Sequence, residues 1–392
     1  MTGIKDRTLL ALTFLHALMH IMATTLPALS PLVKEEFQLN NTYVGVLSFA
    51  FAMATGAGSI ISGFLADRYN SNSLRLVSYG FFGTAIFVAL LFLARNFLAI
   101  SAVFICMGFM LSLYHPSALS YISNTIQLRR GRAFGLHEVG GSIGLAIAPL
   151  AAGIISLYHN WRFAYLFWVF PMLFFTLLLH AISNEIHLHH HTVRPLLSTL
   201  RTLRQDAVVL MRIYLIEGLF GFIIGGALTF IPIFLNEYKG VGAQFAVILA
   251  FVFTGGGAIG KFLGGHLSDI IGERRVMAAG FFIIAPLFFV APLLPLFWCV
   301  LTLALAGIVF PAVLPAILTT ISKLVEPSQR GMAFGLLMFA GFGFGSTSRL
   351  ILGVVSDAFG ISTVFYPIVI AAMAGGFMNV WRIGGLSAGE KQ

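Results

Sequence analysis

The chain has 392 residues, of which 58% are hydrophobic and 9% are charged, and its formal net charge is +9. Soluble domains carry charge on about a quarter of their residues, so this composition excludes a water-soluble fold and favours the bilayer as solvent. Cys106 and Cys299 each lie in an apolar run, and no disulfide framework is expected.

Apolar segments long enough to cross a bilayer, about 20 residues each, occur twelve times. The chain is therefore expected to be an all-α integral membrane protein. The predicted spans are Thr8–Leu32, Tyr43–Ala66, Leu74–Ala94, Phe97–Ile122, Ala133–Tyr158, Phe163–Ile182, Val208–Leu235, Phe245–Ile271, Val276–Pro295, Leu296–Ile321, Met332–Val355 and Val364–Ile383.

Basic residues are unevenly divided between the two sets of connections that twelve spans create. The set that includes both termini holds 17 of the 23 Lys and Arg residues, and the opposite set holds Lys34, Arg95, Arg162 and Lys239. Because basic residues accumulate on the cytoplasmic side, both termini are expected in the cytoplasm, with the chain in the inner (plasma) membrane. This bias accounts for the positive charge without a nucleic-acid partner.

The longest polar break separates the sixth span from the seventh. It contains the histidine run His187–His191 and a Leu/Arg segment that could form a surface helix. We interpret residues 184–206 as a cytoplasmic linker between two six-helix bundles, residues 1–183 and 207–392. The histidine run has metal-ligand chemistry, but a metal role is not predicted for it.

The two halves repeat in sequence at three places in nearly the same register. RGRAFGL, from Arg130 to Leu136, returns as RGMAFGL from Arg330 to Leu336. The loop after span two aligns with the loop after span eight through Gly-x-Leu-x-Asp, and HPSALSYIS on span four aligns with LPAILTTIS on span ten. Such repeats predict two bundles of like fold with a site between them at the midplane.

These features resemble the major facilitator superfamily over the whole chain. The resemblance implies a cytoplasmic gate at the Gly-x-Leu-x-Asp loops, where a carboxylate lies near a helix N-terminus of the other half, an arrangement that the helix dipole favours. The second loop copy is fuller, since Asn70 and Ser71 replace the usual Gly and basic residue in the first. The implied gate residues are Asp67, Arg68, Asp269, Arg274, Arg275 and Arg130.

The fifth span is similar to the superfamily's antiporter signature, although Ala148 and Ala152 replace glycines. Together with the first span and His115-Pro116, its EVGGSIG sequence resembles the fosmidomycin-resistance group of drug efflux antiporters. His20 departs from that group, because it stands where an acidic residue is expected. The resemblance implies proton-coupled export, and this substitution puts the usual coupling residue in question.

Ionisable side chains inside spans are costly in a bilayer and are candidates for function. His16 and His20 are four residues apart on one helix face and could carry protons or simply pack as neutral histidines. His137 and Glu138 point about 100° apart on span five. Glu138 could carry a proton or form a salt bridge near the cytoplasm with Arg129, Arg130 or Arg132.

Arg349, in the middle of span eleven, keeps its charge and needs a partner. It is expected to bind an anionic substrate such as a phosphonate, or to pair with Glu217 or Glu138. Lys261 could line the pathway or extend to the membrane surface. His115 is a candidate lining residue beside the kink that Pro116 predicts.

Small residues on the fifth span form a predicted helix-packing seam, which could also slide, with a proline inside it: Gly140, Gly141, Gly144, Pro149 and Gly153. We expect a secondary transporter that works by alternating access, with a small-molecule substrate and protons as the coupling ion, and a monomer in the bilayer. Nutrient uptake by symport is the alternative. A receptor or enzyme is a remote one, because no catalytic motif is found. No cofactor or metal site is predicted.

Overall fold

A computed structural model describes residues 2–68, 73–125, 130–184, 207–325 and 330–381. Every regular element in these ranges is a helix. The predicted linker, including its histidine run and surface helix, lies outside the described residues apart from residue 184.

The first half of the chain forms eight helical segments. They are α1 (Thr2–Ala28), α2 (Ser30–Glu36), α3 (Asn41–Arg68), α4 (Ser73–Leu91), α5 (Phe97–Ser112), α6 (Tyr114–Thr125), α7 (Arg130–Tyr158) and α8 (Phe163–Asn184). The repeated RG-AFGL sequence begins α7 here and α16 in the second half.

The second half is interrupted more often, by short 3₁₀ and π segments labelled η. It comprises α10 (Ala207–Glu237), α11 (Ala243–Gly255), α12 (Gly257–Ile271), α13 (Glu273–Val290), η2 (Ala291–Leu293), α14 (Leu296–Val309), η3 (Phe310–Ala312), α15 (Val313–Leu324), α16 (Arg330–Met338), η5 (Phe339–Gly343), η6 (Phe344–Ser346), α17 (Thr347–Phe359), η7 (Ile361–Val364) and α18 (Phe365–Val380).

Twelve helical stretches in the described residues are long and apolar enough to cross a membrane. They coincide with the twelve predicted spans to within a few residues at their ends, so the prediction of an all-α, twelve-span membrane protein is confirmed. The separation of spans nine and ten at Pro295 is also correct, because that proline caps the start of α14.

Five of the spans change direction or helix type inside the membrane. Span four breaks at Leu113, just before His115-Pro116, as the proline predicts. Span eight breaks at Gly256, where three consecutive glycines weaken the helix. Span ten breaks at the 3₁₀ turn that contains Pro311, span one divides at Leu29, and span eleven carries the π-helical segment η5.

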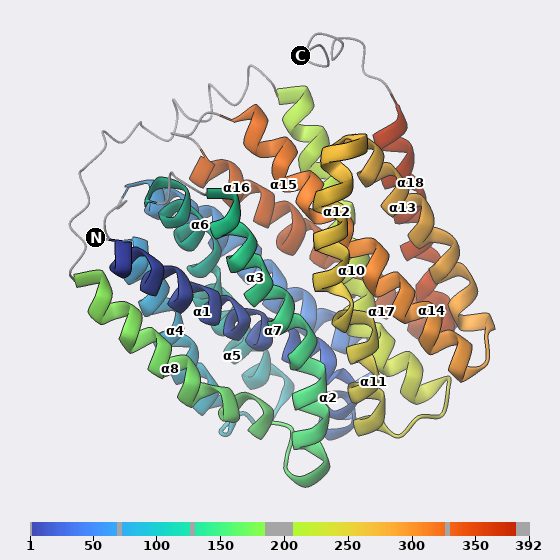
Figure 1. The fold of residues 1–392 in the computed structure, drawn as a ribbon. Coiled ribbons are helices and arrows are strands. Elements are labelled where there is room, and N and C mark those ends of the chain that lie inside the picture. Colours follow the sequence, from blue (N-terminus) through green and yellow to red (C-terminus); the bar gives the residue numbers. More distant parts are fainter. Residues whose placement is uncertain (1, 69–72, 126–129, 185–206, 326–329, 382–392) are drawn as a thin grey trace.

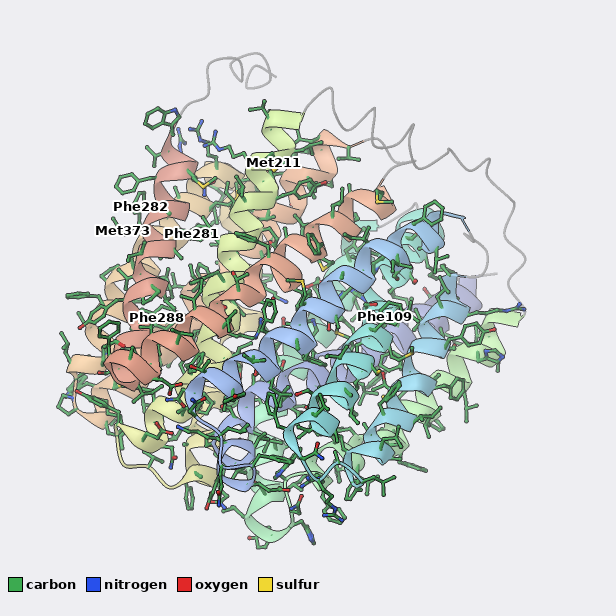
Figure 2. All side chains as sticks on the ribbon, turned by 180° about the vertical axis from the view of Figure 1, so that it is seen from behind. Phe109, Met211, Phe281, Phe282, Phe288 and Met373 are labelled. Carbon is green, nitrogen blue, oxygen red and sulfur yellow. The ribbon has the colours of Figure 1, made fainter. Side chains whose placement is uncertain are left out.

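The described helices gather into two groups, residues 2–184 on one side and 207–381 on the other, and α1 begins at the end of the bundle where α18 finishes (Figure 1). Buried apolar side chains form two clusters that largely follow this division. Apolar side chains also cover the outside of the bundle (Figure 2), where Phe170 and Phe262 are 81% and 77% exposed. Such a surface is stable only against lipid.

Candidate functional site

Four histidines from three helices meet inside the first half. His16 and His20 lie on α1, His115 on the first turn of α6, and His137 on α7. The His16 ring stacks on the His137 ring with centroids 3.9 Å apart, and the Nε2 atoms of His16 and His20 are 3.1 Å apart. The His115 ring meets the rings of His16 and His20 at 5.0 Å and 5.4 Å. We call these four residues the histidine cluster.

Hydrogen bonds to backbone carbonyls fix the roles of several nitrogens in the cluster. The Nδ1 of His16 lies 2.7 Å from the carbonyl oxygen of His137, so this nitrogen carries a proton and donates it. Tyr114 donates its hydroxyl hydrogen to the Leu12 carbonyl at 2.6 Å and therefore accepts from the Nε2 of His137 at 2.9 Å. In neutral His137 the remaining Nδ1 has no proton, and it lies 3.6 Å from a Glu138 carboxylate oxygen.

Glu138 joins the two halves through an ion pair. Its carboxylate lies 3.2 Å from the Nζ of Lys261 on α12, and the two side chains are 28% and 12% exposed. The partner in the described chain is thus Lys261, while the side chains of Arg129, Arg130 and Arg132 lie outside the described residues. Such a pair can respond to a proton, because protonating the carboxylate removes the charge that attracts Lys261.

Arg349 is buried in the second half without an acidic partner in the described chain. Its side chain is 7% exposed, and its Nε and Nη1 atoms have no hydrogen-bond partner. The guanidinium lies over Gly225 of α10, where a methyl group would come within 2.8 Å of Nη1. A buried guanidinium with unused donors is suited to bind an anion, since two parallel N–H groups match a carboxylate or phosphonate.

Glu217 is also buried, at 5% exposure, and its Oε2 has no hydrogen-bond partner. It lies against Gly341 in the π-helical segment η5. The step of eight positions from Glu217 to Gly225 corresponds to about 12 Å along α10, and no ion pair forms between Glu217 and Arg349 in the described chain. The expected pairing of Arg349 with Glu217 or Glu138 is therefore absent.

The glycines of the fifth span form close contacts, chiefly within the first half. A methyl group on Gly140 or Gly144 would lie 2.1 Å from a backbone oxygen of α1, and one on Gly141 would lie 2.5 Å from the His16 ring. Gly153, beyond the buried Pro149, contacts Ile248 of α11 in the other half. The seam thus mainly allows α1 and α7 to pack closely against each other. Within the described residues, its one contact between the two halves is that of Gly153 with Ile248.

The predicted gate residues are only partly described. Asp67, Arg68 and Arg130 lie in helices, but their side chains are outside the described residues. Asp269 is exposed on α12. Arg274 donates to the Asn379 and Val380 carbonyls at the end of α18, and Arg275 donates to the Ile271 carbonyl at 3.4 Å, so their described contacts stay within the second half.

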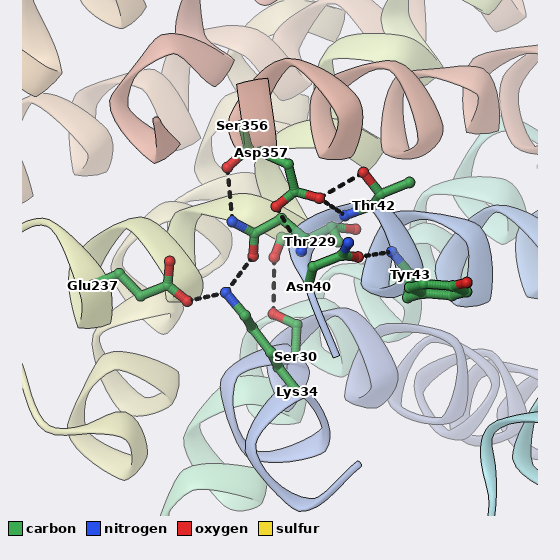
Figure 3. A network of polar contacts seen from close by, with 10 residues as sticks. Ser30, Lys34, Asn40, Thr42, Tyr43, Thr229, Glu237, Ser356 and Asp357 are labelled. Atoms are coloured by element: carbon green, nitrogen blue, oxygen red, sulfur yellow. Dashed lines mark hydrogen bonds and ion pairs between the residues drawn. The ribbon is translucent and has the colours of Figure 1, made fainter. Parts of the chain in front are cut away.

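A polar network joins α2, α3, α10 and α17 (Figure 3). It lies at the end of the first span opposite to the start of α1, because α2 follows α1 in the chain. Asp357, at the end of α17, accepts hydrogen bonds from the backbone N–H of Asn41 and Thr42 at 3.0 Å and 2.8 Å, and from the Thr42 hydroxyl at 2.6 Å. The two backbone N–H groups belong to the first turn of α3, where the helix dipole favours a negatively charged carboxylate. Lys34 bridges Asn41 and Glu237 in the same network. We call this group the distal network.

The end where α1 begins is packed unevenly. A methyl group on Gly335 of α16 would lie 2.9 Å from the Ser59 carbonyl oxygen and 3.6 Å from the Cα of Gly63 on α3. The repeat aligns Gly335 with Gly135 and Gly63 with Gly265, yet a methyl group on Gly135 or Gly265 would meet nothing within 4 Å. Gly335 of α16 therefore approaches α3 closely, whereas Gly135 of α7 and Gly265 of α12 each have open space where a side chain would lie.

Two bundles of membrane-spanning helices, with ionisable groups buried inside each, are the architecture of a membrane transporter. Sequence comparison matches residues 9–258 and 213–390 to the Major Facilitator Superfamily. The chain belongs to this superfamily and is a multi-pass membrane protein.

Relatives of similar length support this assignment. The chain is 26% identical to the fosmidomycin resistance protein of Escherichia coli (strain K12) over 360 residues, which covers 91% of this chain and 87% of that protein. It is 24% identical to an uncharacterised MFS-type transporter of Bacillus subtilis (strain 168), over 92% of this chain and 89% of that protein.

Solved structures show the same fold. A bacterial homologue of the human lysosomal transporter Spinster, in an inward-facing and unoccupied conformation, matches with a TM-score of 0.75 at 20% identity, covering 97% of this chain and 95% of that one. A mutant of the nucleoside transporter NupG matches with a TM-score of 0.74 at 15% identity, covering 95% and 99% of the two chains.

Sequence reasoning missed two parts of this arrangement. Tyr114 was passed over, although it directly precedes His115 in an apolar span, where a buried hydroxyl needs a partner. Asp357 was also missed, although it stands three residues before Gly360, at the end of a span. An acidic residue in that place can reach a neighbouring helix N-terminus.

Proposed function

We propose that this chain is a proton-coupled exporter, an antiporter for a small drug-like or anionic compound, which works by alternating access. The observation that carries the proposal is the Glu138–Lys261 ion pair, which links the two halves within the membrane-spanning region. A carboxylate in this position connects protonation to the contact between the bundles. The fosmidomycin resistance relative is consistent with export of a phosphonate-like compound.

The substrate is proposed to contact Arg349. Its buried guanidinium has two nitrogens without partners, and burying an uncompensated charge is costly. An anionic group on the substrate would remove that cost, so the site favours anions over neutral molecules of similar shape. Gly225 leaves the space in which the guanidinium lies.

Protons are proposed to act at Glu138, with Glu217 as a second candidate. A proton on Glu138 releases Lys261 and loosens the contact between α7 and α12 at this ion pair. Proton and substrate would then compete through charge, because both act at ionisable groups buried in the membrane-spanning region, and such competition is the requirement for antiport.

Alternating access requires each end of the bundle to open in turn. The distal network is the proposed lock for the end opposite the start of α1. Asp67 and Asp269, with the neighbouring Arg68, Arg130, Arg274 and Arg275, are the proposed lock for the other end. The distribution of Lys and Arg favours the cytoplasm for that end and the inner membrane for the protein. A single chain contains both halves, so we propose a monomer.

Uptake of a small organic nutrient by proton symport is the alternative, because the same buried groups could bind proton and substrate together. A receptor or enzyme without transport is the remote alternative. The direction of proton movement relative to the substrate separates the first two possibilities, and the absence of any substrate flux would favour the third.

The test is a proteoliposome assay in which a pH-sensitive dye inside the vesicles reports proton movement as candidate anions are added, fosmidomycin first. Antiport predicts proton movement opposite to the substrate, whereas movement in the same direction would establish symport. Arg349→Ala should abolish transport, while Arg95→Ala, which removes an exposed arginine, should not. Full transport by folded Arg349→Ala would remove Arg349 from the mechanism.

Replacing Glu138 with Gln should leave anion binding measurable but uncouple it from protons. The expected result is substrate exchange without a change of internal pH. Proton coupling that persists in this variant would exclude Glu138 as the proton carrier and favour Glu217. Glu217→Gln would then be measured in the same assay.

A further inference from the structure

Three nitrogens of the histidine cluster converge in one place. His16, His20 and His115 each offer a ring nitrogen, and these nitrogens lie within 4.8 Å of one another. The Nε2 of His115 is buried and has no hydrogen-bond partner, in a side chain that is only 8% exposed. Leaving a buried polar atom without a partner destabilises the fold by about 1–3 kcal/mol. A ligand bound to this nitrogen would remove that cost.

The separation of two of these nitrogens suits a metal ion. Two imidazole nitrogens bound tetrahedrally to Zn²⁺, each about 2.0–2.1 Å from the metal, lie roughly 3.3 Å apart. The Nε2 atoms of His16 and His20 are 3.1 Å apart, which is close to this value. A hydrogen bond could also explain that pair, but it would leave the buried Nε2 of His115 without a partner.

The surroundings of His16 match those of a metal ligand in a second respect. Its Nδ1–H donates to the His137 carbonyl at 2.7 Å, which directs the lone pair of Nε2 toward His20. Metal-bound histidines almost always donate their other nitrogen in this way, because the bond fixes the tautomer and the ring orientation. The stacked His137 ring holds His16 in place.

We propose that His16, His20 and His115 bind a divalent transition-metal ion of the Zn²⁺ type, with a fourth coordination position open. Neutral imidazole suits Zn²⁺, Ni²⁺ and Cu²⁺ and is a poor ligand for Mg²⁺ or Ca²⁺. The proposal concerns binding and does not depend on whether the chain exports an anion. It adds a metal site where none was predicted from the sequence.

A bound ion would act on the contact between the halves. A Glu138 carboxylate oxygen lies within 4.8 Å of one ring nitrogen of His16 and one of His137. Two positive charges at the neighbouring site would attract this carboxylate and compete with Lys261 for it. Metal binding is therefore expected to weaken the Glu138–Lys261 pair, in addition to occupying the three nitrogens.

The experiment uses the full chain, purified in detergent, with the linker histidines His187, His189, His190 and His191 changed to Asn so that they do not bind the probe. Zn²⁺ is titrated by calorimetry, and X-ray absorption identifies its ligands. We expect one ion per chain, bound through three imidazoles. In this background His115→Asn should weaken binding by about 100-fold or more, since even outer-shell changes cost 10–100-fold.

His266→Asn is the matched control, because His266 is exposed on α12 and lies outside the cluster. It should bind Zn²⁺ as the background protein does. His20→Asn provides a second ligand variant should His115→Asn fail to fold, and thermal unfolding of the background with and without Zn²⁺ gives a readout that needs no ligand variant. Unchanged binding in folded His115→Asn or His20→Asn would overturn the proposal, as would a background protein that binds no Zn²⁺ and gains no thermal stability from it.

Discussion

The hydrogen bonds of the distal network predict how much the loss of Asp357 would favour opening of this end of the bundle. Asp357 accepts three bonds from the first residues of α3, and all three cross from one half to the other. A buried hydrogen bond to a charged group stabilises by about 1.5–3 kcal/mol. Because Asp357 is exposed, solvent screening strongly reduces the stabilisation that each of these bonds provides. We therefore expect Asp357→Ala to destabilise the closed end by roughly 2 kcal/mol, which is about a 30-fold change in the opening equilibrium.

A cysteine at position 44 reports this opening. Val44, near the start of α3, is 2% exposed and packs into the buried cluster of the second half. In a background with Cys106 and Cys299 changed to Ala, Val44→Cys should react with a maleimide only when the distal end opens. Its labelling rate should then rise by up to about 30-fold in Asp357→Ala, because the rate follows the population of the open form when closing is fast.

The matched control is Thr363→Ala. Thr363 lies at the same end of the bundle, but its hydroxyl bonds to the Gly360 carbonyl within the second half. It should leave the labelling rate nearly unchanged. Equal labelling in Asp357→Ala and the control, with both proteins folded, would refute the assignment of Asp357 as a lock between the halves.

Three further predictions concern stability, measured by thermal unfolding of the purified protein. Glu138→Gln and Lys261→Met should show a coupling energy of about 0.5–3 kcal/mol in a double-mutant cycle, and strictly additive effects would contradict the ion pair. Gly144→Ala should destabilise by about 1–3 kcal/mol through the clash with α1, whereas Gly135→Ala, with free space around it, should be neutral or stabilising. Arg162→Ala should destabilise by about 1.5–3 kcal/mol, because it removes a buried guanidinium that donates to two backbone carbonyls and pairs with the partly exposed Glu36; a change below 1 kcal/mol would count against this network.

The spans were predictable because lipid imposes one dominant requirement on each segment, which is to be long, apolar and helical. The repeat was predictable for a related reason, since the RG-AFGL copies begin equivalent helices, α7 and α16. The break before His115-Pro116 followed from the missing N–H of proline. These features depend on local sequence.

Partners across the two halves could not be predicted in the same way. Glu138 has three arginines nearby in sequence, yet its described partner is Lys261, 123 residues away. The cation that pairs with Glu138 depends on how closely α7 and α12 approach each other in the folded protein. The sequence of α7 alone does not determine that distance. The convergence of His115 on His16 and His20 likewise depends on a helix break whose direction the proline alone does not determine.

The repeat also relates the buried ionisable groups of the two halves. In the register that aligns Arg130 with Arg330, Gly141 corresponds to Gly341. A methyl group on Gly141 would lie 2.5 Å from the His16 ring, and one on Gly341 would lie 2.5 Å from a Glu217 carboxylate oxygen. Each half therefore places an ionisable side chain of its first span against the equivalent glycine of its fifth.

The equivalent places hold different chemistry. The first half has a histidine with bonded neighbours, and the second has a carboxyl oxygen without a partner beside a π-helical segment, a feature frequent at functional sites. Two like bundles carrying the same group would respond alike to a proton or a cation. Because one has imidazoles and the other a carboxyl group and Arg349, a cation is favoured in the first half and an anion at the guanidinium of the second. In the proposed mechanism, the sequence difference between the repeats thus separates the two proposed ligands by charge, one in each half.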